Sequence, residues 1–98
     1  MPLDSTTYHG IDQDEVLAIL RGAKELIRNR GWCQGSAQGD NGALCLFSAI
    51  REAGNLVVSG DFERLGIPWP AVWQDQPGRT VEDVYAWLDE QIALREVA

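Results

Sequence analysis

Apolar residues recur at three- and four-residue spacing near the start of the chain, the pattern of one buried helical face. This stripe consists of Val16, Ile19, Leu20, Ala23, Leu26 and Ile27. Asp12 is placed to cap the first turn, and Glu15 completes a pair similar to a capping box. Basic side chains fill the last turns, and Gly31 offers a left-handed stop. The pattern therefore predicts a helix over residues 12–30.

A glycine-rich segment follows, with Asp40 and Asn41 among its residues, so we expect residues 31–42 to form a loop with tight turns. A second helix is then predicted to begin at Asp40 or Asn41 and to run to Gly54. It is apolar on nearly every side, which is typical of a helix surrounded by the rest of a fold. A strand over residues 43–47 is the alternative, because short apolar runs are ambiguous.

The second half of the chain contains shorter signals. Ser59 is expected to cap a brief turn through residues 61–65, closed by Gly66. Residues 67–70 should be extended, since each of the two prolines disfavours helix at the residue before it, and residues 76–78 read as a turn. The last helix should open at Thr80, whose hydroxyl can cap the amide of Asp83. Its predicted buried stripe is Val81, Val84, Leu88 and Ile92.

These elements predict a mainly α fold: a compact bundle of three main helices with long irregular connections. The first and last helices are expected to run antiparallel and to sandwich the apolar second helix. An added short β-hairpin is the alternative. Residues 1–10 are polar and lack periodicity, so we predict a flexible N-terminal segment there and a single helical domain over residues 11–98.

Charge narrows the classes of function. The net charge is −7 and the pI is about 4.4, which argues against a broad phosphate-binding surface and so against direct binding of nucleic acid. Basic residues gather in residues 21–30 and acidic ones from Asp61 onward. We interpret them as two solvated helix faces of opposite sign. The alternatives are an acidic face that binds a basic partner, or an acidic mimic of nucleic acid.

The chain contains no run of about 18 apolar residues, and its start lacks the basic and apolar parts of a secretion signal. We therefore expect no membrane association and a cytoplasmic location. In that compartment, cysteines are more often free thiols than members of a structural disulfide.

The two cysteines, Cys33 and Cys45, flank the glycine-rich loop. A thiol nucleophile needs a nearby base, and the single histidine, His9, lies in the segment that we expect to be flexible. A structural zinc site would need four Cys or His ligands, whereas this chain has two cysteines and one histidine. We therefore predict no metal, no cofactor and no enzymatic activity, with Cys45 as a buried filler. A thiol- or metal-dependent site at Cys33 and Cys45 is the alternative.

Four tryptophans are many for 98 residues, so some should lie at the surface. Two of them flank a segment stiffened by prolines, and the region is rich in polar side chains. This segment is either a rigid patch for a protein partner or a loop held to the core by its own tryptophans. Our leading hypothesis is a protein-binding module, with self-association to a homodimer as an alternative. Its predicted contact residues are Trp69, Trp73, Gln74, Asp75 and Arg79.

Three motifs occur together: Gly-Trp-Cys-Gln-Gly at 31–35, Asn-Gly-x-x-Cys-Leu at 41–46, and Trp-Gln-Asp at 73–75 before Arg-Thr-Val-Glu-Asp-Val at 79–84. In this combination the chain resembles, over about residues 12–94, a family of small domains of unknown function common in actinobacteria and their phages. At the positions of Trp73, Gln74 and Asp75, sequences of that family usually have Trp-Asn-Asp, so Gln74 stands here in place of the family's asparagine. The resemblance implies no reaction. It implies a phage or actinobacterial cytoplasmic setting, in which small acidic proteins bind a host or cellular protein.

Overall fold

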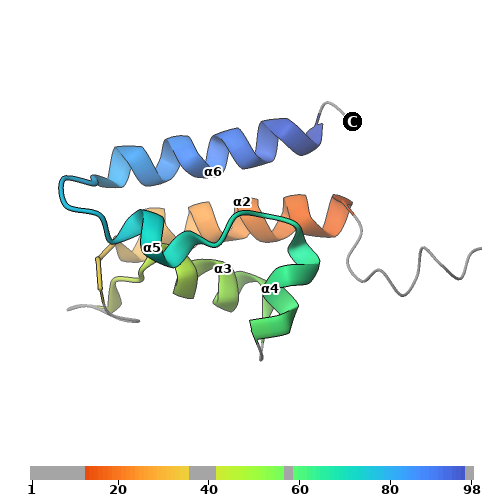
Figure 1. Cartoon of the computed structure of the whole chain (residues 1–98), viewed down its shortest axis with the longest axis horizontal. Helices are drawn as coiled ribbons and strands as arrows, with labels where there is room; N and C mark the ends of the chain where they lie inside the picture. The colour runs from red at the N-terminus through yellow and green to blue at the C-terminus, as the bar shows by residue number, and fades with distance from the viewer. Residues whose placement is uncertain (1–12, 36–41, 57–58, 97–98) are drawn as a thin grey trace, which may run out of the picture.

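A computed structural model describes residues 13–35, 42–56 and 59–96 of the protein. Its elements, in the labels of Figure 1, are α2 (Gln13–Arg30), α3 (Leu46–Gly54), α4 (Ser59–Leu65), α5 (Pro70–Gln74) and α6 (Val81–Glu96). The predicted mainly α class with three main helices is confirmed, and the described ranges contain no strand. The predicted N-terminal segment and the cap at Asp12 lie outside the described residues.

The order of the three main helices differs from the prediction. Helix α2 lies between α3 and α6, and α6 runs antiparallel to α2 (Figure 1). The apolar second helix was therefore wrongly expected in the middle. Helix α3 is not central because one of its faces carries the exposed side chains Arg51 and Glu52 and is turned to solvent. Helix α2 is longer and buries a wider apolar face, so it can pack against two neighbours. The buried residues of α2 are Val16, Leu17, Ile19, Leu20, Ala23 and Ile27.

Helices α2 and α3 approach each other closely at Gly22. A Cβ atom added to Gly22 would lie 3.3 Å from the Cβ atom of Ala53. The absence of a side chain at this position of α2 therefore lets the two helices pack at short range. Gly22 and Ala53 belong to two different helices that are far apart in the sequence. No local sequence pattern therefore predicts that they meet.

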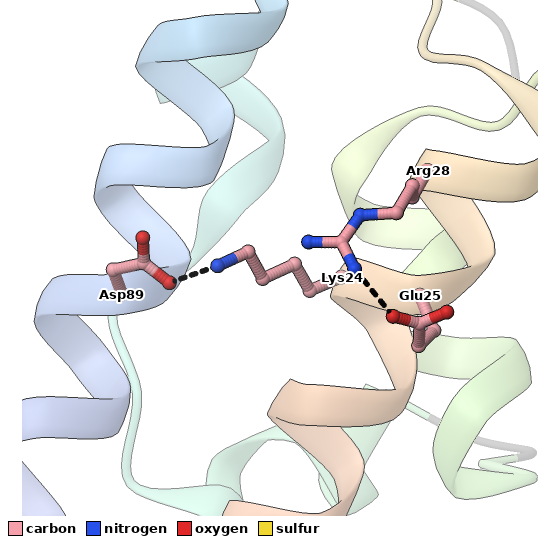
Figure 2. A network of polar contacts seen from close by, with 4 residues as sticks. All are labelled: Lys24, Glu25, Arg28 and Asp89. Carbon is pink, nitrogen blue, oxygen red and sulfur yellow. Dashed lines mark hydrogen bonds and ion pairs between the residues drawn. The ribbon is translucent and has the colours of Figure 1, made fainter.

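Two of the basic side chains of α2, Arg21 and Lys24, pair with acidic side chains of α6. Lys24 Nζ lies 2.7 Å from Asp89 Oδ1, and Figure 2 shows this pair crossing between the two helices. Arg21 forms a second ion pair with Glu96. The two charged faces predicted to be separately solvated therefore meet each other, because antiparallel packing brings the end of α6 beside α2. Exposed pairs of this kind contribute little to stability.

Helix α2 ends where the sequence predicts, because Gly31 has a φ of 91°. Helix α3 begins at Leu46, so the predicted start at residue 40 or 41 is wrong. The chain before Leu46 is held extended: Leu44 N donates to Gly31 O at 2.9 Å, and Cys33 N donates to Leu44 O at 3.1 Å. These bonds form an isolated parallel bridge, the one trace of the strand alternative in the described residues.

Helix α5 is absent from the prediction, which gave an extended segment up to Pro70. Residues 67–69 lie outside any helix and Trp69 is extended as expected, but Pro70 is the first residue of α5. Proline is favoured at this first position, because the helix does not use its missing N–H and its φ angle is already helical. Pro70 therefore starts a short helix within the segment that was predicted to be irregular.

The predicted start of the last helix is confirmed. Asp83 N donates to Thr80 Oγ1 at 3.2 Å, and Thr80 N donates to Asp83 Oδ2 at 3.0 Å. This reciprocal pair is a capping box with aspartate at its third position. The predicted turn before it is also present, and Gly78 has a φ of 88°. Three members of the predicted stripe are buried: Val84, Leu88 and Ile92.

Candidate functional site

The side chain of Gln74 joins three parts of the fold. Its residue is 2% exposed. Its Oε1 atom accepts a hydrogen bond from Trp32 Nε1 at 2.8 Å and another from the backbone N of Leu46 at 3.1 Å. One amide oxygen therefore connects α5 with the glycine-rich loop and satisfies an otherwise unpaired N–H at the start of α3.

The loop makes further polar contacts with α5. Gln34 Nε2 donates to the backbone oxygens of Gln74 and Gln76, at 2.8 Å and 3.0 Å. Gly35 N donates to Asp75 Oδ1 at 2.8 Å, and Gln74 Nε2 donates to the same oxygen. We call this set the loop clamp, which comprises Trp32, Gln34, Gly35, Gln74 and Asp75. Its polar groups are used to hold the chain together.

Trp73 and Arg79 attach the turn before α6. The Trp73 ring lies 5.9 Å from that of Trp87, and the Arg79 guanidinium carbon lies 4.0 Å from the Trp73 ring centre. Arg79 Nε also donates to Trp73 O at 2.9 Å. These contacts give Trp73 the role of a residue that holds its own segment to the core, one of the two roles considered from the sequence.

Trp69 lies in a separate aromatic cluster. Its ring centre is 5.3 Å from that of Phe47 and 5.4 Å from that of Phe62, and the two phenylalanines stack at 4.7 Å. Trp69 is nevertheless 49% exposed, and Val72, three residues later, is 70% exposed. We call these two residues the Trp69–Val72 face.

The five predicted contact residues thus fall into two groups. Trp73, Gln74, Asp75 and Arg79 lie together around the loop clamp and the following turn, whereas Trp69 belongs to the aromatic cluster. Gln74 is buried, and its amide is hydrogen-bonded within the chain instead of facing solvent. Val72 is not among the contact residues predicted from the sequence. A helix starting at Pro70 would have placed Val72 one turn after Trp69. Gln34, which lies in the quoted glycine motif, was also missed.

The two cysteines have separate surroundings, and neither is in a disulfide. Cys45 Sγ accepts from Ser48 N at 3.3 Å and so caps α3, while Cys33 Sγ lies 3.6 Å from Ala43 O. The buried position predicted for Cys45 is confirmed. Within the described ranges, no group of three His, Cys, Asp or Glu residues is placed to hold a metal ion. His9 lies outside these ranges.

The fold and these contacts define a small helical domain in which a glycine-rich loop is fastened to a short helix. The chain belongs to the Family of unknown function (DUF6197), whose sequence pattern matches residues 12–72. That match contains the glycine-rich loop and the Cys45 cap, and it ends two residues before Gln74. Neither the curated proteins nor the solved structures contain a match to this chain. In the described part of the chain, no helix has the length and apolar character needed to cross a membrane.

Proposed function

We propose that this protein is a non-enzymatic protein-binding module whose contact surface is centred on the Trp69–Val72 face. The observation that carries the proposal is the exposure of these two apolar side chains, 49% and 70%, at the start of α5. The two residues are three positions apart at the start of α5, and exposed apolar patches are typical of contact sites. Tryptophan is also enriched among residues that dominate binding energy.

The arrangement favours binding because the face is held in place before a partner arrives. Trp69 rests on Phe47 and Phe62, so less side-chain freedom remains to be lost on association. The loop clamp fixes the other end of α5 through Gln74. Of the predicted contact residues, Trp69 therefore forms part of the face, whereas Gln74 and Asp75 hold α5 in place.

The partner that fits this face is a protein with an apolar pocket able to receive an indole. The acidic charge of the chain would favour a partner with basic residues around that pocket. From the family resemblance we infer a cytoplasmic accessory role in an actinobacterium or one of its phages, with a host or cellular protein as the partner. A second copy of this chain is the alternative occupant.

Affinity capture with paired variants tests the proposal. Trp69→Ala and Val72→Arg should each abolish capture of the partner by the immobilised protein, whereas Ala18→Arg, on the exposed side of α2, should not. Circular dichroism establishes that all three variants are folded. Sedimentation of the wild-type protein over a range of concentrations distinguishes self-association from binding of another protein. Equal capture by Val72→Arg and Ala18→Arg would contradict the proposal.

The other two hypotheses have less support. A nucleic-acid mimic needs a regular row of free carboxylates, but Asp89 and Glu96 of α6 are paired with Lys24 and Arg21. A thiol site needs an activating neighbour, and the contacts of Cys45 are those of a helix cap. Both observations favour the binding module.

A further inference from the structure

A groove of about 550 Å³ opens where the first residue of α2 meets the last turn of α6. In Figure 1 this is the end of the α2–α6 pair near the C-terminus. The residues that line it are Gln13, Gly66, Pro68, Gln91, Leu94 and Arg95. The lining is mixed, with Leu94 58% exposed beside one arginine, so the groove combines an apolar wall with a cation.

The guanidinium of Arg95 is fixed in this groove by neutral acceptors. Its Nη1 atom donates to the backbone oxygen and to Oε1 of Gln91, at 2.9 Å and 3.1 Å. Its Nη2 atom donates to Gly66 O at 2.8 Å. Other basic side chains in the described ranges, such as Lys24 and Arg30, are in ion pairs with carboxylates. Arg95 is thus held in position without a carboxylate among the residues that the structure describes.

Two donors of Arg95 are left over by these contacts. A guanidinium has five N–H groups, and the three bonds above use both on Nη1 and one on Nη2. The Nε atom is buried and has no hydrogen-bond partner in the described part of the chain. Because Nε lies below the molecular surface, the N–H left over on Nη2 is the donor that a ligand in the groove can reach.

An unmatched donor on a partly desolvated cation is unfavourable. Burial lowers the pKa of Arg95 below its ordinary value, because desolvation disfavours the charged form. Arginine nevertheless stays protonated at neutral pH. A bound anion would supply both the missing acceptor and the missing negative charge.

We propose that this groove is a carboxylate-binding site in which the remaining Nη2 N–H of Arg95 donates to a carboxylate oxygen and the guanidinium supplies the opposite charge. Leu94 and Pro68 would contact the apolar part of the same ligand. The groove has the volume of a small-molecule site and suits either a short carboxylic acid or the last residue of a peptide. The residues that line the groove are not those of the Trp69–Val72 face, so a test of this site is independent of a test of the proposed function.

The test is a titration of ¹⁵N-labelled full-length protein, observed at the Arg95 Nε–H and Gly66 N–H signals. The probes are N-acetyl-leucine and its neutral amide, N-acetyl-leucinamide. The acid should give a saturable shift with a Kd on the order of 1 mM, the range for a fragment of this size, and the amide should give none. Hexanoate distinguishes the two sources: binding equal to that of N-acetyl-leucine indicates a small free acid, and weaker binding indicates a peptide C-terminus.

Variants separate a built site from a general attraction of anions. Arg95→Gln should weaken binding of N-acetyl-leucine by roughly 10-fold or more, and Arg95→Lys, which keeps the charge but loses the planar group that Gln91 and Gly66 hold in place, should also weaken it. Arg51→Gln, an exposed position on α3, should leave it unchanged. Thermal unfolding establishes that each variant is folded. The proposal is overturned if the amide shifts the signals as the acid does, if Arg95→Gln binds as well as the wild type, or if inorganic phosphate binds more tightly than the acid.

Discussion

The indole N–H of Trp32 donates to the side-chain oxygen of Gln74 at 2.8 Å, across 42 positions of sequence. The two residues belong to the two motifs that stand out most in the sequence, the Gly-Trp-Cys-Gln-Gly loop and the Trp-Gln-Asp stretch. Their contact explains why both motifs occur in one chain: the second supplies the acceptor for the first. The shared role is to hold α5, and the exposed face at its start, against the glycine-rich loop and α3.

Gln74→Leu should lower the free energy of unfolding by about 2–4 kcal/mol. The change leaves the Trp32 Nε1–H and the Leu46 N–H buried without an acceptor, and each such loss costs about 1–3 kcal/mol. Urea unfolding followed by tryptophan fluorescence measures the effect. Gln76→Ala, at an exposed position two residues later, is the control and should change stability by less than about 0.5 kcal/mol. Similar losses in both variants would show that the buried amide has no special role.

Cys45→Ala should lower the free energy of unfolding by about 1 kcal/mol, because α3 loses the side chain that accepts from Ser48 N. Cys45→Ser should stay close to the wild type, since a hydroxyl accepts the same bond. Thermal unfolding of both variants gives the comparison. If serine is as damaging as alanine, the sulfur acts through its apolar packing and the capping explanation is wrong.

Gly22→Leu should lower the free energy of unfolding by about 1–3 kcal/mol, the usual cost of forcing a larger side chain into a packed interface. The new side chain would collide with Ala53, whose Cβ is 3.3 Å from where the new Cβ would be. Ala18→Leu, four residues earlier on an exposed part of α2, is the matched control and should have little effect. The midpoint of urea unfolding should fall for Gly22→Leu and stay near the wild-type value for Ala18→Leu. Equal midpoints for the two variants would contradict the close approach at Gly22.

The Lys24–Asp89 pair should have a coupling energy of only about 0.2–1 kcal/mol, because both side chains are partly solvated (Figure 2). A double-mutant cycle with Lys24→Met and Asp89→Asn measures this coupling directly. The coupling should shrink when salt is raised, since added ions screen exposed charges. A coupling of several kcal/mol that is insensitive to salt would contradict the assignment of this pair to the surface.

The sequence predicted best what depends on near neighbours. The end of α2 at Gly31 and the cap of α6 at Thr80 are both local features, and each is where the prediction placed it. The start of α3 was missed, because the bonds from Leu44 to Gly31 and from Cys33 to Leu44 cross the glycine-rich loop. No periodicity in residues 40–46 reveals those partners.

By itself, the sequence determined the helical class, the end of α2, the start of α6, and the expectation that some tryptophans lie at the surface. These follow from the spacing of apolar residues and from caps within a few positions of each helix end. Only the tertiary structure decided which helix is central, that Gln74 is buried, and that Trp69 is the exposed tryptophan of the predicted set. The physical reason is that burial depends on long-range contacts: the acceptor of Gln74 serves donors 42 and 28 residues away, which no local pattern records.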